Sequence, residues 1–170
     1  NDVFFALSHG VHRGQLKSRS SDDREKFIKS LINKCKNIRF DIFGMDNIQP
    51  IWADQYFKNI SNSKMGLNLS RGTPIKYYIS DRITQIIGNG LVTLIDEKTC
   101  YGDFFDDTEM VFYKNITDLS EKIEKISEDE KLRKKIGQKG KTKYIKYFNS
   151  TLVADFIINK TFEINGPKKY

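Results

Sequence analysis

Short apolar segments alternate along this chain with segments of helical periodicity, and this alternation constrains the fold more than any other feature. Most of the apolar segments are continuous instead of alternating with polar residues, which is typical of strands covered on both faces. The predicted strands are residues 3–7, 39–43, 65–69, 91–95 and 110–113. The predicted helices are residues 22–36, 52–62, 80–88, 117–127 and about 149–162, and a capping-box pattern of Ser127 and Glu130 predicts one more.

Strands that alternate with helices predict a doubly wound α/β fold with a parallel sheet of about five to six strands. The length of 170 residues fits a single domain, which we assign to residues 1–163, followed by a disordered tail over 164–170. The sequence starts with Asn1 and enters a strand almost at once, so we expect it to begin inside a longer protein. In such folds ligands bind beyond the carboxyl ends of the strands.

The chain is basic, with 29 Lys and Arg against 22 Asp and Glu, a net charge of +7. Residues 114–147 hold eleven basic and six acidic residues, so +5 of this charge lies in one helical stretch. Three explanations remain open: a solvated helix surface, a peripheral contact with an anionic membrane surface, and nucleic-acid binding. Because no nucleic-acid-binding motif accompanies the charge, we expect no nucleic-acid partner.

The two cysteines, Cys35 and Cys100, are too few for a disulfide framework and fit a reducing compartment. We therefore expect a cytoplasmic protein, with the membrane surface as a further option. No apolar run approaches the roughly 20 residues of a membrane-spanning helix. Both histidines, His9 and His12, are far in sequence from either cysteine, so no metal is expected.

The loop after the first predicted strand is the first candidate for ligand binding. Gly14 would let backbone amides approach a phosphate, and Arg13 and Lys17 would supply positive charge. The loop contains neither GxGxxG nor GxxxxGK[ST], so it is not a dinucleotide fingerprint or a Walker A loop. The alternative is a flexible basic surface loop.

The helix predicted over residues 80–88 is the second candidate. Ser80 or Asp81 can cap it, and its first turn offers free N–H groups at the positive end of the helix dipole. Asp81, Arg82 and Gln85 share a face that would meet a ligand. The alternative is a local ion pair between Asp81 and Arg82, with Gln85 in solvent.

Residues 64–69 and 80–93, taken in order, resemble the carboxy-terminal domain of group 1-like glycosyltransferases of the GT-B fold. Those domains have a "GLN" strand, then a Ser-x-Arg-x-x-Glu helix that runs into a glycine turn and an apolar strand. Residues 105–113, 118–123 and 131–140 also resemble segments of the family. The likeness spans about residues 3–160 and depends on the order and spacing of weak motifs.

This resemblance implies a nucleotide-sugar donor bound between two Rossmann-like domains, mainly by the carboxy-terminal one. The residues it implies for the donor diphosphate are Arg13, Gly14, Lys17, Ser80, Asp81 and Arg82. Those it implies for the nucleoside are Gly44, Met45, Ser70, Arg71 and Gln85. Gln85 stands where the family usually has a glutamate that bonds the ribose hydroxyls, and a neutral amide bonds a diol more weakly than a carboxylate does.

The resemblance also implies a hexosyltransferase-type activity in polysaccharide biosynthesis, with a glycan, a lipid or another molecule as acceptor. No metal cofactor is expected, because Arg, Lys and helix amides would stabilise the departing diphosphate. We expect an N-terminal acceptor domain outside this sequence and no transfer by the isolated domain. The alternative function is a non-catalytic α/β interaction or regulatory domain, including a degenerate transferase domain.

Overall fold

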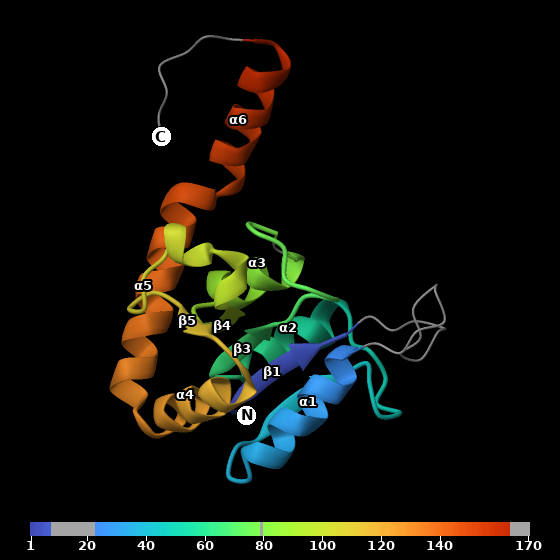
Figure 1. Ribbon diagram of the computed structural model, residues 1–170. Helices are drawn as coiled ribbons and strands as arrows, with labels where there is room; N and C mark the ends of the chain where they lie inside the picture. Colours follow the sequence, from blue (N-terminus) through green and yellow to red (C-terminus); the bar gives the residue numbers. More distant parts are fainter. Residues whose placement is uncertain (8–22, 79, 164–170) are drawn as a thin grey trace.

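The computed structural model describes residues 1–7, 23–78 and 80–163, and its five strands form one all-parallel sheet with helices on both faces (Figure 1). The strand order is β2-β1-β3-β4-β5. The strands are β1 (Val3–Ala6), β2 (Phe40–Phe43), β3 (Met65–Asn68), β4 (Val92–Asp96) and β5 (Val111–Tyr113). Each overlaps one of the predicted apolar segments, so the prediction of a doubly wound α/β sheet is confirmed. The proposed tail, residues 164–170, lies outside the described residues.

Helices cover the two faces of the sheet because alternate strand residues point to opposite sides. The helices are α1 (Asp23–Lys34), α2 (Ala53–Ser61), α3 (Asp81–Gly88), α4 (Ile116–Glu128), α5 (Glu130–Phe148) and α6 (Ser150–Thr161). Val3 and Phe5 of β1 belong to the core cluster that includes α1 and α4. Phe4 lies on the other face, against Ile60 of α2 and Ile86 of α3. The central strand is thus buried on both sides.

Helix α5 packs so closely that its backbone touches the backbone of neighbouring loops. A Cβ atom added at Gly137 would lie 2.1 Å from the carbonyl oxygen of Gly90, and one added at Gly140 would lie 2.3 Å from that of Glu109. Two glycines three positions apart on one side of α5 therefore allow this approach. The contact fixes α5 against the turn between α3 and β4.

The helix termini correct one local prediction. The side chain of Asp129 caps α5 by accepting a hydrogen bond from Leu132 N at 2.8 Å. Ser127, the predicted cap, instead donates to the carbonyl oxygen of Glu124 at 2.7 Å, within α4. Ser and Asp are both preferred cap residues. Because α4 continues to Glu128, Ser127 lies inside that helix and cannot cap α5.

Helix α6 follows α5 and projects away from the sheet (Figure 1). No residue of α6 is buried, and Val153, Phe156 and Ile157 are 46–56% exposed. The periodicity of the sequence predicted this helix correctly. The described residues, however, provide no core for its apolar side chains.

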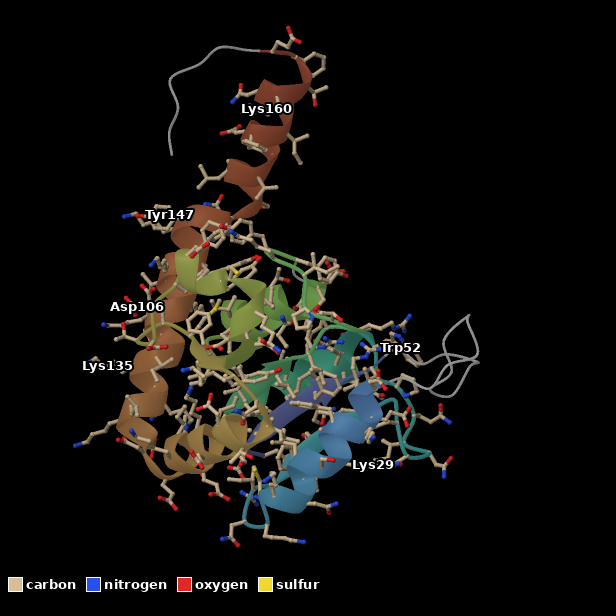
Figure 2. The ribbon with its side chains drawn as sticks, viewed as in Figure 1. Lys29, Trp52, Asp106, Lys135, Tyr147 and Lys160 are labelled. Carbon is tan, nitrogen blue, oxygen red and sulfur yellow. The ribbon has the colours of Figure 1, made fainter. Side chains whose placement is uncertain are left out.

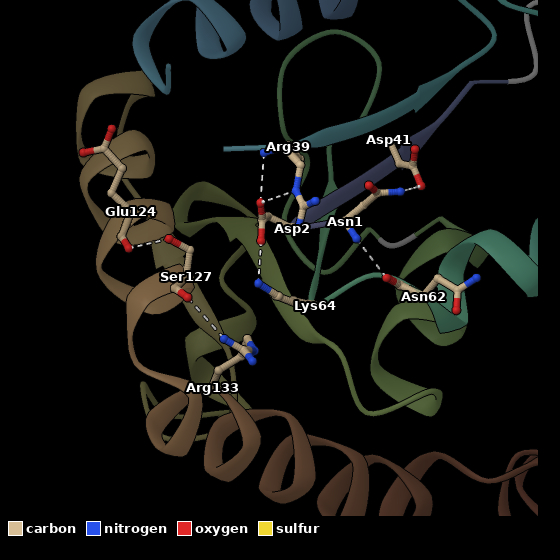
Figure 3. A network of polar contacts seen from close by, with 9 residues as sticks. All are labelled: Asn1, Asp2, Arg39, Asp41, Asn62, Lys64, Glu124, Ser127 and Arg133. Atoms are coloured by element: carbon tan, nitrogen blue, oxygen red, sulfur yellow. Dashed lines mark hydrogen bonds and ion pairs between the residues drawn. The ribbon is translucent and has the colours of Figure 1, made fainter. Parts of the chain in front are cut away.

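At the edge of the sheet where the strands begin, the carboxylate of Asp2 links the amino ends of β1, β2 and β3 (Figure 3). It accepts hydrogen bonds from Arg39 N at 2.9 Å and from Lys64 Nζ at 2.7 Å. Arg39 precedes β2 and Lys64 precedes β3. Burial by itself would raise the pKa of Asp2, but the hydrogen bonds from Lys64 and Arg39 outweigh it, and the pKa is lowered.

Replacing Gly137 with alanine tests the close approach of α5. We expect Gly137→Ala to lower the free energy of unfolding by about 1–3 kcal/mol, because the new methyl group overlaps the Gly90 carbonyl. Urea denaturation measures the effect. Gly88→Ala is the matched control, since it is also helical and its Cβ would meet nothing within 4 Å. Equal free energies of unfolding for the two variants would contradict the close contact.

Replacing Asp2 with asparagine tests the ionic link between the strands. Because the pKa of Asp2 is lowered in the folded protein, its charge stabilises the fold above the unfolded pKa of about 4, and this is lost as pH falls towards the folded value. We expect Asp2→Asn to cost about 1–3 kcal/mol of unfolding free energy at pH 7 and clearly less near pH 3. Urea denaturation at both pH values measures this, with the exposed Asp107→Asn as control. A cost independent of pH would exclude the ionic link.

Candidate functional site

The carboxyl ends of the strands lie together at one edge of the sheet, and several predicted site residues lie there. The chain runs from β1 outwards to β2 and then returns to β3 on the other side of β1. The gap between β1 and β3 is therefore the topological switch point, where open α/β sheets bind their ligands. Helix α3 begins beside this point.

Arg82, in the first turn of α3, links the two strands that flank the switch point. Its Nε and Nη2 atoms donate to the carbonyl oxygen of Ala6 at 3.3 and 3.1 Å. Its Nη1 atom donates to the carbonyl oxygen of Leu69 at 3.2 Å and to Ser80 Oγ at 3.5 Å. The guanidinium group also lies 4.8 Å from the centre of the Phe5 ring. Arg82 thus links the ends of β1 and β3, and we call this side chain the clamp.

The clamp keeps its positive charge at the edge of the sheet. Burial, followed by the nearby Arg24, lowers the pKa of Arg82 to about 10, so the guanidinium stays protonated at neutral pH. The sequence left open an ion pair between Asp81 and Arg82 as an alternative, and none is found among the described residues. Four of the five guanidinium N–H groups are engaged. Within the described part of the chain, one N–H group of Arg82 has no acceptor.

The amino end of α3 is open. Ser80 occupies the cap position, but its side chain makes no capping hydrogen bond. Its hydroxyl group donates instead to Asn68 Oδ1, at 2.9 Å, at the end of β3. Asp81 is exposed at the first helical position. The positive end of the helix dipole therefore lies beside the switch point without a side-chain cap from Ser80.

The predicted nucleoside residues come from two loops and from α3. Gly44 has φ +81°, and a Cβ there would lie 1.9 Å from the Leu7 carbonyl oxygen, so the loop after β2 lies directly against the end of β1. Met45 is buried in the core, so its side chain is not available to a ligand. Ser70 and Gln85 are partly exposed, and Arg71 is exposed. Arg13, Gly14 and Lys17 lie outside the described residues.

A cavity of about 180 Å³ opens at the same edge, between the start of α1 and the ends of β3, β4 and β5. Two of its residues, Asn68 and Tyr113, are only 2% and 1% exposed. Within the described chain, Asn68 Nδ2 and the Tyr113 hydroxyl group have no hydrogen-bond partner. Sequence reasoning missed both as site residues. The available signal was a polar group within or at the end of an apolar strand.

Trp52 is the first residue of the segment 52–62 that the sequence predicts as a helix. Ile60, in the same segment, is fully buried. Trp52, however, is 62% exposed and precedes the first turn of α2, on the side of the molecule where β1 ends (Figure 2). Trp52 thus presents an exposed aromatic ring at that side of the molecule.

No metal-binding arrangement is found within residues 1–7, 23–78 and 80–163, where no three His, Cys, Asp or Glu side chains group suitably. The adjacent carboxylates of residues 106–107 do not form such a group either. Asp106 instead accepts hydrogen bonds from the backbone N–H and the hydroxyl group of Thr108. None of the helices in the described part of the chain has the length and apolar character needed to cross a membrane.

Solved structures share this architecture. Sucrose-phosphate synthase from Thermosynechococcus elongatus aligns with 89% of this chain at a TM-score of 0.60 and 14% identity. TarM of S. aureus, solved with fondaparinux, alpha-GlcNAc-glycerol and UDP, aligns with 93% at 0.64 and 13% identity. The chain spans 37% and 34% of those two proteins. It spans 86% of the C-terminal domain of LpcC, a group 1 family glycosyl transferase from Francisella tularensis, with 88% of this chain aligned at 0.57 and 12% identity.

The fold is therefore the Rossmann-like carboxy-terminal domain of GT-B glycosyltransferases. A family model described as "Glycosyl transferase-like" matches residues 19–159, which is most of the chain. The chain belongs to this family, as the resemblance of its motifs predicted. No curated protein matches the sequence.

The clamp can be tested by a change that keeps its charge. We expect Arg82→Lys to lower the free energy of unfolding by about 1–3 kcal/mol, because a lysine cannot bond the Ala6 and Leu69 carbonyls in the same planar geometry. Urea denaturation at neutral pH measures the change. Arg133→Lys, whose guanidinium group donates to the Ser127 carbonyl oxygen at 3.3 Å, is the control. A loss no larger than in the control would show that Arg82 does not hold the strands.

Proposed function

We propose that this chain is the donor-binding domain of a glycosyltransferase and that it binds a nucleoside-diphosphate sugar at the carboxyl edge of its sheet. The observation that carries the proposal is the joint position of the Arg82 charge and the open amino end of α3 at the switch point. Both features favour an anion. Family membership and the UDP in the TarM structure support a nucleotide as that anion.

In this proposal the protein acts through electrostatics. As the bond between the sugar and the diphosphate breaks, negative charge grows on the departing diphosphate. Arg82 and the backbone N–H groups of the first turn of α3 would stabilise that charge, together with Arg13, Gly14 and Lys17 from the loop after β1. Ser80 donates a hydrogen bond to Asn68, and Asp81 is the first residue of α3, so both would fix the position of the first turn of the helix. No metal takes part in this proposal.

The nucleoside would occupy the neighbouring loops. The backbone of Gly44 and Met45 faces the end of β1, and Ser70 and Arg71 follow β3. Gln85 lies one turn after Asp81 on α3 and would bond the ribose hydroxyls through its amide. Trp52 offers an exposed aromatic surface for the base.

A second, acceptor-binding domain belongs to the proposal. This chain spans about a third of sucrose-phosphate synthase and of TarM, and α6 carries exposed apolar side chains that a neighbouring domain would cover. We infer that transfer to a glycan, a lipid or another acceptor, in polysaccharide biosynthesis, needs both domains. The chain described here would bind a donor but would not transfer its sugar.

The basic stretch over residues 114–147 would give such an enzyme a peripheral contact with an anionic membrane surface in the cytoplasm. Several of its lysines are engaged with nearby groups, such as Lys122 with Asp118 at 2.9 Å and Lys143 with Glu109 at 2.7 Å. Lys135, by contrast, points outwards from α5 (Figure 2). The exposed lysines are the ones that would meet lipid headgroups.

One observation favours a second candidate function. Gln85 replaces the glutamate that the family usually carries on α3, which weakens the expected ribose contact. A degenerate transferase domain with an interaction or regulatory role would retain the fold but would no longer bind a nucleotide sugar. Ligand binding separates the two candidates, because only the first requires it.

Thermal unfolding with added nucleotides tests the proposal. We expect UDP or GDP, at ten times its dissociation constant, to stabilise the domain by about 1.4 kcal/mol and to raise its melting temperature by about 3–6 °C. Uridine and guanosine are the controls, since they lack the diphosphate that Arg82 and α3 would hold. We expect Arg13→Ala and Lys17→Ala to reduce the shift. If no nucleoside diphosphate or nucleotide sugar shifts the melting temperature at millimolar concentration, the proposal is wrong.

A further inference from the structure

The corner between α5 and α6 consists of a single residue. Helix α5 ends at Phe148 and α6 begins at Ser150, so only Asn149 separates them. Its backbone has φ −70° and ψ 157°, an extended conformation that interrupts the helical path. The two helices therefore meet at a corner and do not form one continuous helix (Figure 1).

The side chain of Asn149 is hydrogen-bonded to both helices. Its Nδ2 atom donates to the carbonyl oxygen of Ile145, in the last turn of α5, at 2.9 Å. Its Oδ1 atom accepts from Leu152 N, in the first turn of α6, at 3.0 Å. An amide has its donor and its acceptor on separate atoms, so one side chain can satisfy backbone groups at the end of one helix and at the start of the next.

The core holds the last turn of α5, on one side of this corner. The ring of Phe148 stacks on the rings of Phe105 and Tyr144, with ring centres 5.8 and 5.5 Å apart. It also meets the ring of Phe104 edge-on, at 6.2 Å. Phe105 is buried and belongs to a core cluster, so these contacts anchor the end of α5 to the body of the domain.

Helix α6, on the other side of the corner, is not buried against the core in the described part of the chain. None of its 12 residues is buried. A helix of this length is marginal by itself in water, and β-branched residues such as Val153 and Ile157 favour helix less than Ala or Leu do. The hydrogen bonds of Asn149 are therefore well placed to fix where α6 starts and in which direction it points.

We propose that Asn149 sets the direction of α6, because its side chain bonds the end of α5 and the start of α6 together. This direction is a property of the chain itself and needs no ligand. Its consequence rests on the proposed function. If a neighbouring domain covers the apolar side chains of α6, the same amide decides how that domain is placed relative to the donor site.

Distances between two spin labels, measured by pulsed electron paramagnetic resonance, test the proposal. Lys135→Cys on α5 and Lys160→Cys on α6 replace exposed side chains and carry the labels (Figure 2). The chain's own thiols are removed by Cys35→Ala and Cys100→Ser. A continuous helix would separate the two labelled positions by about 37 Å along its axis.

We expect one narrow distance distribution in the labelled parent chain. Asn149→Ala should widen this distribution about twofold or more, because the variant loses the hydrogen bonds to both helices. Asn149→Asp keeps the acceptor for Leu152 N but loses the donor to Ile145, so its width should lie between those of the parent and the alanine variant.

Asn89→Ala is the matched control. Asn89 also donates to the backbone four residues before it, to the carbonyl oxygen of Gln85 at 2.7 Å, but the helix that it ends is followed by β4 and not by another helix. This variant should leave the distances between the labels unchanged. Circular dichroism and urea denaturation check that every labelled variant is folded.

Each outcome bears on the proposal. A wide distribution in the parent chain, or an unchanged distribution in Asn149→Ala, would overturn it, because the corner would then be loose or fixed by other contacts. A narrow distribution at a new distance in Asn149→Ala would support it, since the direction of α6 would have changed. A parent-like width in Asn149→Asp would overturn the role of the bond to Ile145.

Two further comparisons complete the test. Broadening in Asn89→Ala as large as in Asn149→Ala would assign the effect to general loosening of the fold and would overturn the proposal. No nucleotide or sugar takes part in these measurements. Failure of the corner is therefore distinguishable from failure of the proposed function, which the thermal shift with nucleotides decides.

Discussion

The hydrogen bonds from Arg82 to the carbonyl oxygens of Ala6 and Leu69 are the interaction on which the candidate site depends. Parallel strands end in carbonyl groups that must find donors once the sheet is covered by helices. Here one guanidinium group supplies donors to both strands at the switch point and brings a positive charge with it. The same side chain therefore links the ends of both strands, and in the proposed function it also supplies the charge that meets the anion.

At each of the two edges of the sheet, one charged side chain links neighbouring strands, and the two side chains have opposite charges. At the amino edge, the Asp2 carboxylate accepts from Arg39 and Lys64 and joins three strands (Figure 3). At the carboxyl edge, Arg82 donates to two strands. Asp2 is satisfied by partners of its own chain. Arg82 has no carboxylate partner among the described residues.

Most of the fold could be predicted from the sequence, because its signals are local. Continuous apolar runs indicated all five strands, and three- to four-residue periodicity indicated the helices except α5, which a capping pattern indicated. The errors arose where two local signals competed or where burial depends on distant residues. Ser127 and Asp129 are both good caps, and the length of α4 decided between them. Trp52 and the apolar residues of α6 have helical spacing, yet the described chain places no core against them.

The sequence by itself determined the order of strands and helices, the glycines that let α5 approach its neighbours, and the family to which the chain belongs. Only the tertiary structure decided what Arg82, Asn68 and Tyr113 contact. Arg82 and Ala6 are 76 residues apart in the chain, and Asn68 and Tyr113, from separate strands, line the same cavity. Such contacts follow from the packing of the whole sheet, which no local pattern of residues encodes.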